Sequence, residues 1–236
     1  MAILAGGLGT RLRSALPDTP KVLAPVLSKP FLAHLLDLFE AAGFFDVVLL
    51  TGYRADLVHE AFGNRYGAVR LRYSVETAPL GTGGALRQAA PLFQTEHVLL
   101  VNGDSCCPAD LAAFLEFHEE RQADASLLLA SVADAGRFGL VEVDQQARVR
   151  AFHEKTGQAR PGLVNAGLYF LRRDLLADIP TERAVSLERE VLPGWLASQK
   201  VFGSITTAPL LDIGTPESYR AAEEFLTRLA VASAVH

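Results

Sequence analysis

The sequence predicts an α/β fold in which helices cover both faces of a mostly parallel mixed sheet. In the first half of the chain, short apolar runs alternate with amphipathic stretches, as in parallel strands that helices connect. In the second half, apolar runs follow one another with only turns between them, which indicates further strands. The chain contains neither an internal repeat nor a linker rich in Pro, Gly or Ser, so a single domain, residues 1–236, is expected.

The first half is expected to contain four strands and four helices. Strand 2–5 is short and apolar, and helix 30–42 ends at Gly43, a residue type common after the last helical turn. One face of this helix is apolar and expected to be buried; it consists of Leu32, Leu35, Leu36 and Phe39. The other segments are strand 46–51, helix 55–62, strand 69–74, helix 82–93, strand 97–101 and helix 108–121. The last of these begins with Pro108 in its first turn, where proline is tolerated.

The second half is expected to contain strands first and helices towards its end. The predicted strands are 125–132, 139–143, 149–152 and 163–171. Helices are predicted at 186–196 and 216–229, with extended chain near 201–205 and 209–212. Thr215 precedes Pro216 and is therefore the expected N-cap of the last helix.

The composition is that of an ordinary globular protein and excludes several classes. Half of the residues are hydrophobic and 21 % are charged. The net charge of -5 argues against nucleic-acid binding, which depends on clustered Lys and Arg. No segment approaches the roughly 20 apolar residues that span a membrane, and the first residues do not resemble a signal peptide. Cys106 and Cys107 are adjacent, which disfavours a relaxed disulfide, so reduced thiols packed near a strand end in a cytoplasmic protein are expected.

A glycine-rich turn follows the first predicted strand. Gly6, Gly7 and Gly9 would let backbone N–H groups approach an anion closely, and Arg11 and Lys21 could then bind phosphate oxygens. The turn lacks the Gly-Lys-Ser/Thr ending of a Walker loop. It also lacks the third glycine and the acidic residue after the second strand that define the dinucleotide fingerprint. A tight turn with solvated cations is the alternative interpretation.

Two aspartates are candidate ligands for one metal ion. Asp104 directly follows strand 97–101, and ligands gather at the carboxyl ends of parallel strands. Asp212 ends an extended segment and is free for other roles if Thr215 caps the helix. Two carboxylates with phosphate oxygens and waters form the usual shell of Mg²⁺. Structural roles for each aspartate are the alternative. Five histidines show no ligand spacing and are assigned no catalytic role: His34, His59, His97, His118 and His153.

Six motifs run in order along nearly the whole chain. They are Leu4–Leu12 with Pro20-Lys21, Pro79–Ala85, Asn102–Asp104, Phe152–Lys155, Asn165–Tyr169 and Asp212–Pro216. This series resembles the sugar-1-phosphate nucleotidyltransferases. Within that family the chain is similar to the bacterial D-glycero-D-manno-heptose 1-phosphate guanylyltransferases, on its short length, the segment 79–84, Ser186-Leu187-Glu188 and the closing 212–216.

The resemblance implies a Rossmann-like, nucleotide-diphospho-sugar transferase fold. Residues 1 to about 122 would mainly bind the nucleotide, and residues from about 123 to 236 would mainly bind the sugar. The chain departs from the family at Thr156, where Pro often follows Glu-Lys. Because the chain ends soon after its last predicted helix, the left-handed β-helix domain of some relatives is not expected.

The resemblance further implies a reaction and its residues. The sugar phosphate would attack the α-phosphorus of a nucleoside triphosphate, and pyrophosphate would leave in line. Arg11 and the amides of 7–10 would neutralise the departing phosphates, and Lys21 would contact the α-phosphate or the sugar phosphate. Asp104 and Asp212 would hold Mg²⁺.

The binding residues implied by the resemblance fall into two groups. The nucleotide site would comprise Leu4, Gly6, Gly7, Gly9, Thr10, Arg11, Pro79, Gly81, Thr82, Asn102 and Gly103. The sugar phosphate would be bound by Lys21, Gly139, Glu154, Lys155 and Asn165. Glu154-Lys155 as a solvated pair, Asn165 as a turn residue and 81–84 as a simple loop are the alternatives.

The expected substrates are GTP and D-glycero-α-D-manno-heptose 1-phosphate. The same chemistry with mannose 1-phosphate and GTP, N-acetylmuramate 1-phosphate and UTP, or glucose 1-phosphate and dTTP is open. A non-catalytic subunit that binds nucleotide sugars is the alternative from another class, disfavoured because Arg11, Lys21, Asp104 and Asp212 are all present. An apolar helix face near 225–235 leaves a homo-oligomer open.

Overall fold

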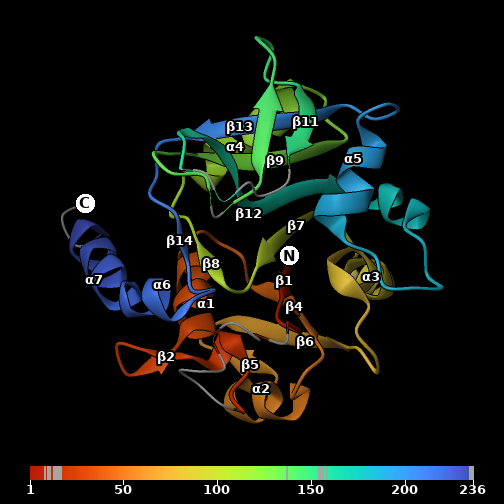
Figure 1. Ribbon diagram of the computed structural model, residues 1–236. Helices are drawn as coiled ribbons and strands as arrows, with labels where there is room; N and C mark the ends of the chain where they lie inside the picture. Colours follow the sequence, from red (N-terminus) through yellow and green to blue (C-terminus); the bar gives the residue numbers. More distant parts are fainter. Residues whose placement is uncertain are drawn as a thin grey trace.

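A ten-stranded mixed sheet forms the centre of the computed structural model (Figure 1). The structure describes residues 1–7, 9, 12, 18–136, 138–153, 157 and 159–233. The strands are β1 (Ala2–Leu4), β2 (Pro25–Val26), β3 (Lys29–Pro30), β4 (Asp46–Thr51), β5 (Arg65–Tyr66), β6 (Val69–Val75), β7 (His97–Asn102), β8 (Ser105–Cys106), β9 (Ala125–Val132), β10 (Leu140–Val143), β11 (Val149–His153), β12 (Gly162–Arg172), β13 (Val201–Thr206) and β14 (Leu211–Asp212).

The helices are mostly short. The α-helices are α1 (Phe31–Ala41), α2 (Ala55–Phe62), α3 (Gly81–Ala89), α4 (Leu111–Glu120), α5 (Leu192–Trp195), α6 (Pro216–Arg220) and α7 (Ala222–Ser233). Three 3-10 helices are η1 (Lys21–Leu23), η2 (Ala90–Leu92) and η3 (Arg173–Asp178), and η4 (Leu187–Val191) is a π-helix. Within the described ranges, none of the helices has the length and apolarity that a bilayer crossing requires.

The sheet has a parallel half and an antiparallel half. The main order is β11-β10-β12-β7-β1-β4-β6-β5, and β9 pairs with both β12 and β13. The strands β7, β1, β4 and β6 are parallel to one another, whereas β12 runs antiparallel to β7, β9 and β10. The predicted α/β fold with a mixed sheet is therefore confirmed. The order of the parallel strands reverses at β1, because β4 and β6 lie on one side of it and β7 on the other, and such a reversal creates a crevice at the carboxyl ends of the strands.

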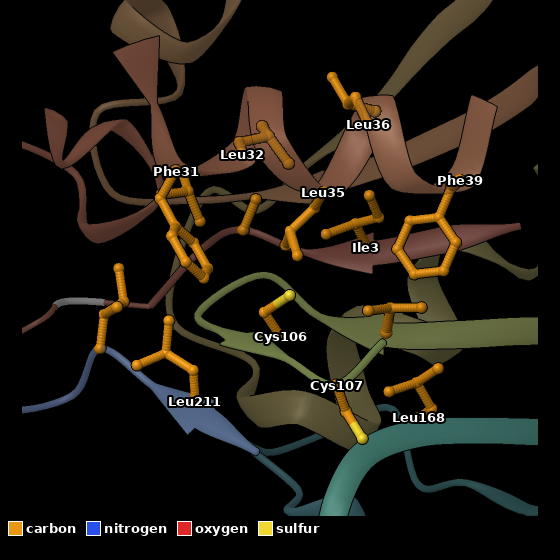
Figure 2. Packing of buried hydrophobic residues seen from close by; sticks show 14 of the residues in the cluster. Ile3, Phe31, Leu32, Leu35, Leu36, Phe39, Cys106, Cys107, Leu168 and Leu211 are labelled. Carbon is orange, nitrogen blue, oxygen red and sulfur yellow. The ribbon is translucent and has the colours of Figure 1, made fainter. Parts of the chain in front are cut away.

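Helices cover both faces of the sheet, and each face has its own apolar core. Ile3 of β1 packs in the core with α1, α2 and α4, whereas its neighbour Ala2 packs in the core with α3 and α5. The predicted apolar face of α1 is buried in the first core (Figure 2). Gly43, with φ 86°, follows the helix end as expected. Cys106 and Cys107 are free thiols in the same core, and burial raises their pKa values to about 12 and about 11.

The predicted bounds are reproduced for 46–51, 55–62 and 125–132 but are wrong for several helices. The helix expected at 108–121 begins at Leu111, because Asp110 caps it by accepting a hydrogen bond from Ala113 N at 3.0 Å, which leaves Pro108 outside. The helix expected at 82–93 ends at Ala89 and continues as η2. The predicted helix 186–196 is η4 followed by α5, and 216–229 divides into α6 and α7.

Candidate active site

Two loops that the sequence singled out meet at the ends of adjacent parallel strands. Leu4, at the end of β1, is paired with Asn102 of β7. The next residue, Gly103, donates its N–H to Leu4 O at 2.9 Å. A Cβ on Gly103 would lie 2.4 Å from Leu4 O, so no other residue fits here without moving the strand end. The glycine-rich turn and the Asn102–Asp104 motif therefore border the same crevice.

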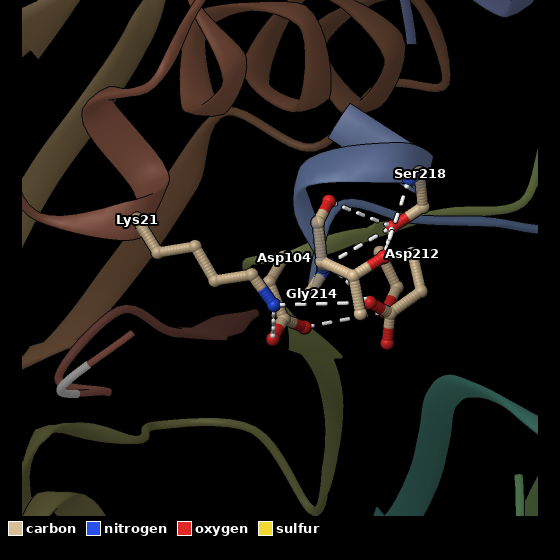
Figure 3. A network of polar contacts seen from close by, with 7 residues as sticks. Lys21, Asp104, Asp212, Gly214 and Ser218 are labelled. Atoms are coloured by element: carbon tan, nitrogen blue, oxygen red, sulfur yellow. Dashed lines mark hydrogen bonds and ion pairs between the residues drawn. The ribbon is translucent and has the colours of Figure 1, made fainter. Parts of the chain in front are cut away.

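The two predicted aspartates come together through a short antiparallel ladder. Strand β14 pairs with β8, which places Asp212 opposite Ser105, the residue after Asp104. Ile213 N also donates to Asp104 O at 3.0 Å. The side chains of Asp104 and Asp212 lie near each other beside the Lys21 ammonium (Figure 3). Residues 108 positions apart in sequence are thus held side by side by backbone hydrogen bonds.

The ammonium group of Lys21 lies between the two carboxylates. Its Nζ is 2.6 Å from Asp104 Oδ2 and 3.8 Å from Asp212 Oδ1 (Figure 3). The Lys21 side chain is only 10 % exposed, which strengthens its interaction with both carboxylates relative to a surface pair. The three side chains carry a net charge of -1, so the site can accept further positive charge.

The carboxylate pair fits a hard divalent cation. Asp104 and Asp212 already share one cation, the Lys21 ammonium, so both can reach a common ion. In the described part of the chain, no group of three or more His, Cys, Asp or Glu side chains could hold a metal ion. Mg²⁺ does not require such a group, because it takes most of its six ligands from waters and substrate phosphates. Thr215 caps α6 as predicted, with Ser218 completing a capping box, which leaves Asp212 out of that role.

A first pocket, with a cavity volume of about 260 Å³, extends from Asp104 along the end of β1. It is lined by Leu4, Gly6, Gly7, Lys21, Val22, Glu76, Pro79, Gly81, Thr82, Ala85, Asn102, Gly103 and Asp104. Gly81 has φ 73°, and a Cβ there would lie 2.5 Å from Val185 O, so glycine is required for this wall. The described lining carries three charged side chains, and burial raises the pKa of one of them, Glu76.

A second pocket, of about 490 Å³, lies on the other side of the carboxylate pair. It is lined by Asn102, Ser105, Phe138, Gly139, Leu140, Val141, Phe152, His153, Asn165, Tyr169, Ser186, Glu188, Arg189, Pro193, Leu210 and Asp212. Asn102 lines both pockets, and its Oδ1 is buried with no hydrogen-bond partner among the described atoms. The two pockets therefore meet at Asn102, with Asp104 on one side and Asp212 on the other.

The structure brings most of the predicted site residues together. The first pocket contains eight of the eleven residues assigned to the nucleotide: Leu4, Gly6, Gly7, Pro79, Gly81, Thr82, Asn102 and Gly103. Gly9 is outside this lining and lies against the Lys21 side chain. The second pocket contains Gly139 and Asn165. Four predicted residues lie outside the described residues: Thr10, Arg11, Glu154 and Lys155.

Asn165 stabilises a turn and also lines the second pocket, so both roles predicted for it from the sequence are compatible with the structure. Its Oδ1 accepts a hydrogen bond from Gly167 N at 2.9 Å, which is turn chemistry, and its Nδ2 donates to Tyr169 OH at 2.9 Å. The amide also lines the second pocket. One Nδ2 proton is left for a ligand, so Asn165 can donate but has less capacity to accept.

Comparison with known proteins identifies the family of the chain. The family model described as "Nucleotidyl transferase" matches residues 1–228. The chain belongs to the nucleotidyl transferase family. It is 37 % identical to a D-glycero-alpha-D-manno-heptose 1-phosphate guanylyltransferase of Aneurinibacillus thermoaerophilus, over 95 % of this chain and 96 % of the relative.

Two further relatives widen the comparison. A mannose-1-phosphate guanylyltransferase of Mycobacterium tuberculosis is 39 % identical over 92 % of this chain, which spans 61 % of that relative's length. The crystal structure of HddC from Yersinia pseudotuberculosis complexed with GMP-PN matches with a TM-score of 0.86 and 32 % identity, over 95 % of this chain and 98 % of that one. Nucleotidyl transfer to a sugar phosphate is thus the activity that this nucleotidyl transferase shares with its relatives.

Several residues of the two pockets escaped the sequence analysis. Glu76 directly follows strand β6 and belongs to none of the motifs, so nothing in the sequence identifies it as a binding residue. Glu188 stood in a motif that supported the resemblance but received no role. Tyr169 was also part of a motif, yet an aromatic in an apolar strand is usually a core residue. His153, which pairs with Glu142 at 2.9 Å, lines the second pocket although it has no ligand spacing.

Proposed function

We propose that this nucleotidyl transferase converts GTP and D-glycero-α-D-manno-heptose 1-phosphate to the GDP-sugar and pyrophosphate, with Mg²⁺ as cofactor. One observation carries the proposal: Asp104 and Asp212, which border different pockets, flank a single, largely buried cation, the Lys21 ammonium. A nucleotide in the first pocket and a sugar phosphate in the second would bring their phosphates together at that point. The first half of the chain would then mainly bind the nucleotide and the second half the sugar.

The chemistry requires little beyond positioning and charge. Two substrates with several negative charges must approach each other, so the site has to reduce their repulsion. Lys21 would contact the α-phosphate or the sugar phosphate, and Arg11 with the amides of the glycine-rich turn would bind the phosphates that leave. Mg²⁺ held by Asp104 and Asp212 would neutralise the phosphates that it contacts.

The position of Glu76 supports guanine as the base. Its Oε2 accepts a hydrogen bond from Leu80 N at 2.8 Å, whereas in the described part of the chain no donor is bonded to Oε1, which lies beside Gly6. Guanine presents two adjacent N–H donors on its Watson–Crick edge, and a carboxylate can accept both. Uracil and thymine offer one such donor at a ring nitrogen, so they would satisfy Glu76 less well.

Substrate choice is testable by pyrophosphate release. The purified protein would be assayed with the four nucleoside triphosphates against heptose, mannose, glucose and N-acetylmuramate 1-phosphates, with and without Mg²⁺. We expect the highest kcat/KM for GTP with the heptose 1-phosphate, and loss of activity when Mg²⁺ is chelated. Turnover with UTP or dTTP but not with GTP would contradict the proposed base.

Mannose 1-phosphate is the second candidate sugar, favoured by the similarity to the mycobacterial enzyme. A higher kcat/KM with mannose 1-phosphate than with the heptose 1-phosphate would establish it. A non-catalytic binding subunit would release no pyrophosphate with any pair.

The two buried free thiols, Cys106 and Cys107, support a reducing, cytoplasmic setting for the protein.

A further inference from the structure

Three hydroxyl groups converge on the carboxylate of Glu188. Thr82 Oγ1 and Ser186 Oγ donate to Glu188 Oε2, at 2.7 and 3.2 Å. Tyr169 OH donates to Glu188 Oε1 at 2.9 Å. Tyr169 is fully buried, and burial together with the charge of Glu188 raises the pKa of Tyr169 well above its ordinary value. The Tyr169 hydroxyl therefore stays a donor at neutral pH.

The pattern of donors requires a carboxylate at this position. Thr82 Oγ1 accepts a hydrogen bond from Leu187 N at 2.8 Å, and Tyr169 OH accepts one from Asn165 Nδ2 at 2.9 Å. Each hydroxyl has one proton, which it must donate to Glu188. A carboxylate accepts on both oxygens, whereas an amide would present an NH₂ group to one of the two hydroxyls. That hydroxyl would then lose its acceptor.

The segment that carries Glu188 is fixed to the start of α3. Val185 N donates to Leu80 O at 2.8 Å, and Gly83 N donates to Val185 O at 2.9 Å. Short π-helices such as η4 frequently occur at functional sites, because they redirect side chains within a helix. Here Glu188 reaches Thr82, a wall residue of the first pocket, while Glu188 and Tyr169 both line the second pocket.

We infer that Glu188 is a positioning residue that couples nucleotide binding to sugar phosphate binding. The inference rests on the proposed function for the assignment of the two pockets. Glu188 bonds to Thr82 at the first pocket and to the buried Tyr169 behind the second, so a nucleotide that fixes Thr82 also fixes the Glu188 carboxylate that lines the second pocket. Linkage requires the reverse effect to be equal, so the sugar phosphate tightens nucleotide binding by the same factor.

The coupling can be measured without turnover. The affinity of an α,β-methylene analogue of GTP, which cannot transfer its nucleotidyl group, would be measured by calorimetry with and without sugar 1-phosphate. The variants are Glu188→Gln, Thr82→Val and Tyr169→Phe, with Thr82→Ser as the conservative rescue. Glu190→Gln is the matched control, because Glu190 is exposed on the same turn, accepts from Ser186 N, and keeps an accepting oxygen as glutamine.

Each variant has a defined expected result. In Glu188→Gln, we expect that sugar 1-phosphate no longer increases the affinity for the nucleotide analogue. The analogue alone should bind about tenfold more weakly, which is the cost of losing one hydrogen bond to a charged group. Thr82→Val, although it alters the first pocket, should raise the KM for the sugar phosphate, and Tyr169→Phe should weaken nucleotide binding. Thr82→Ser keeps the hydroxyl that bonds to Glu188 and should therefore recover the coupling that Thr82→Val loses. Glu190→Gln should behave like the wild type.

Two results would contradict the inference but would leave the proposed function unaffected. The first is that the wild type is active and that Glu188→Gln shows the same coupling between nucleotide and sugar phosphate binding as the wild type. The second is a change in Glu188→Gln confined to the sugar KM, which would make Glu188 a sugar contact only. If Glu188→Gln does not fold, the comparison of Thr82→Val with Thr82→Ser decides. A wild type that releases no pyrophosphate with any pair would refute the proposed function and this inference with it.

Discussion

Replacement of Lys21 by methionine tests whether one ammonium group holds the two site carboxylates together. Lys21 Nζ lies 2.6 Å from Asp104 and 3.8 Å from Asp212. At an effective dielectric constant of about 20, each attraction amounts to several kcal/mol before desolvation is subtracted. Asp104 is 37 % and Asp212 27 % exposed, so solvent screens a large part of it. We expect Lys21→Met to lower the free energy of unfolding by about 2 kcal/mol.

Denaturant and thermal unfolding without divalent metal would measure this loss. In a chain of 236 residues, about 2 kcal/mol corresponds to a decrease in Tm of about 4–8 °C. Lys29→Met is the control, because Lys29 pairs with Asp37 where the two side chains are 38 % and 45 % exposed. That pair should contribute less than about 1 kcal/mol. Equal losses from the two variants would refute the argument from burial.

Magnesium provides a second measurement on the same variant. Without the ammonium, Asp104 and Asp212 face each other with uncompensated charge, so a divalent cation should bind more tightly. Millimolar Mg²⁺ should therefore restore more stability to Lys21→Met than it adds to the wild type. If Mg²⁺ stabilises neither protein, Asp104 and Asp212 do not form the metal site.

Three further predictions concern turnover, base choice and pH. Asp104→Asn should lower kcat at least about a hundredfold in a folded protein, because it removes a charge that acts in the transition state; near-normal pyrophosphate release would contradict this. Glu76→Gln should lower kcat/KM for GTP about tenfold and lower kcat/KM for UTP less, as measured in the same assay. Burial, with the nearby His97, lowers the pKa of His118 from 6.5 to about 4, so the unfolded state binds more protons between these values. Stability should therefore fall by about 3 kcal/mol as the pH decreases from 6.5 to 4, and His118→Phe should lose less over that range in urea titrations.

The sequence was sufficient to predict the parallel half of the sheet. The strand 46–51 is apolar and bounded by helical patterns, and the face of α1 repeats at helical spacing, so periodicity alone identifies both. The glycine-rich turn and Asp104 could be assigned to one crevice because parallel strands end at a common edge. These inferences depend on local pattern and on topology that local pattern implies.

The closeness of Asp104 and Asp212 depends on features that periodicity cannot detect. Strands β8 and β14 are two residues long, and nothing in so short a segment predicts its partner or register. The position of Glu188 depends on a π-helix, whereas the apolar pattern of 186–196 suggested an ordinary α-helix. From the sequence alone, Asp104 and Asp212 are candidates for one metal site, and the β8–β14 ladder is the structural reason why they converge.

The thiol of Cys106 offers a built-in reporter on this ladder. Cys106 is paired with Leu211 directly beside the two aspartates, and its accessible surface is only 2 %. A pKa of about 12 leaves almost no thiolate at neutral pH, so a thiol-labelling reagent reacts only when the two strands separate. The labelling rate of Cys106 thus records how often the ladder beside Asp104 and Asp212 opens, and a ligand that bridges β8 and β14 would slow it.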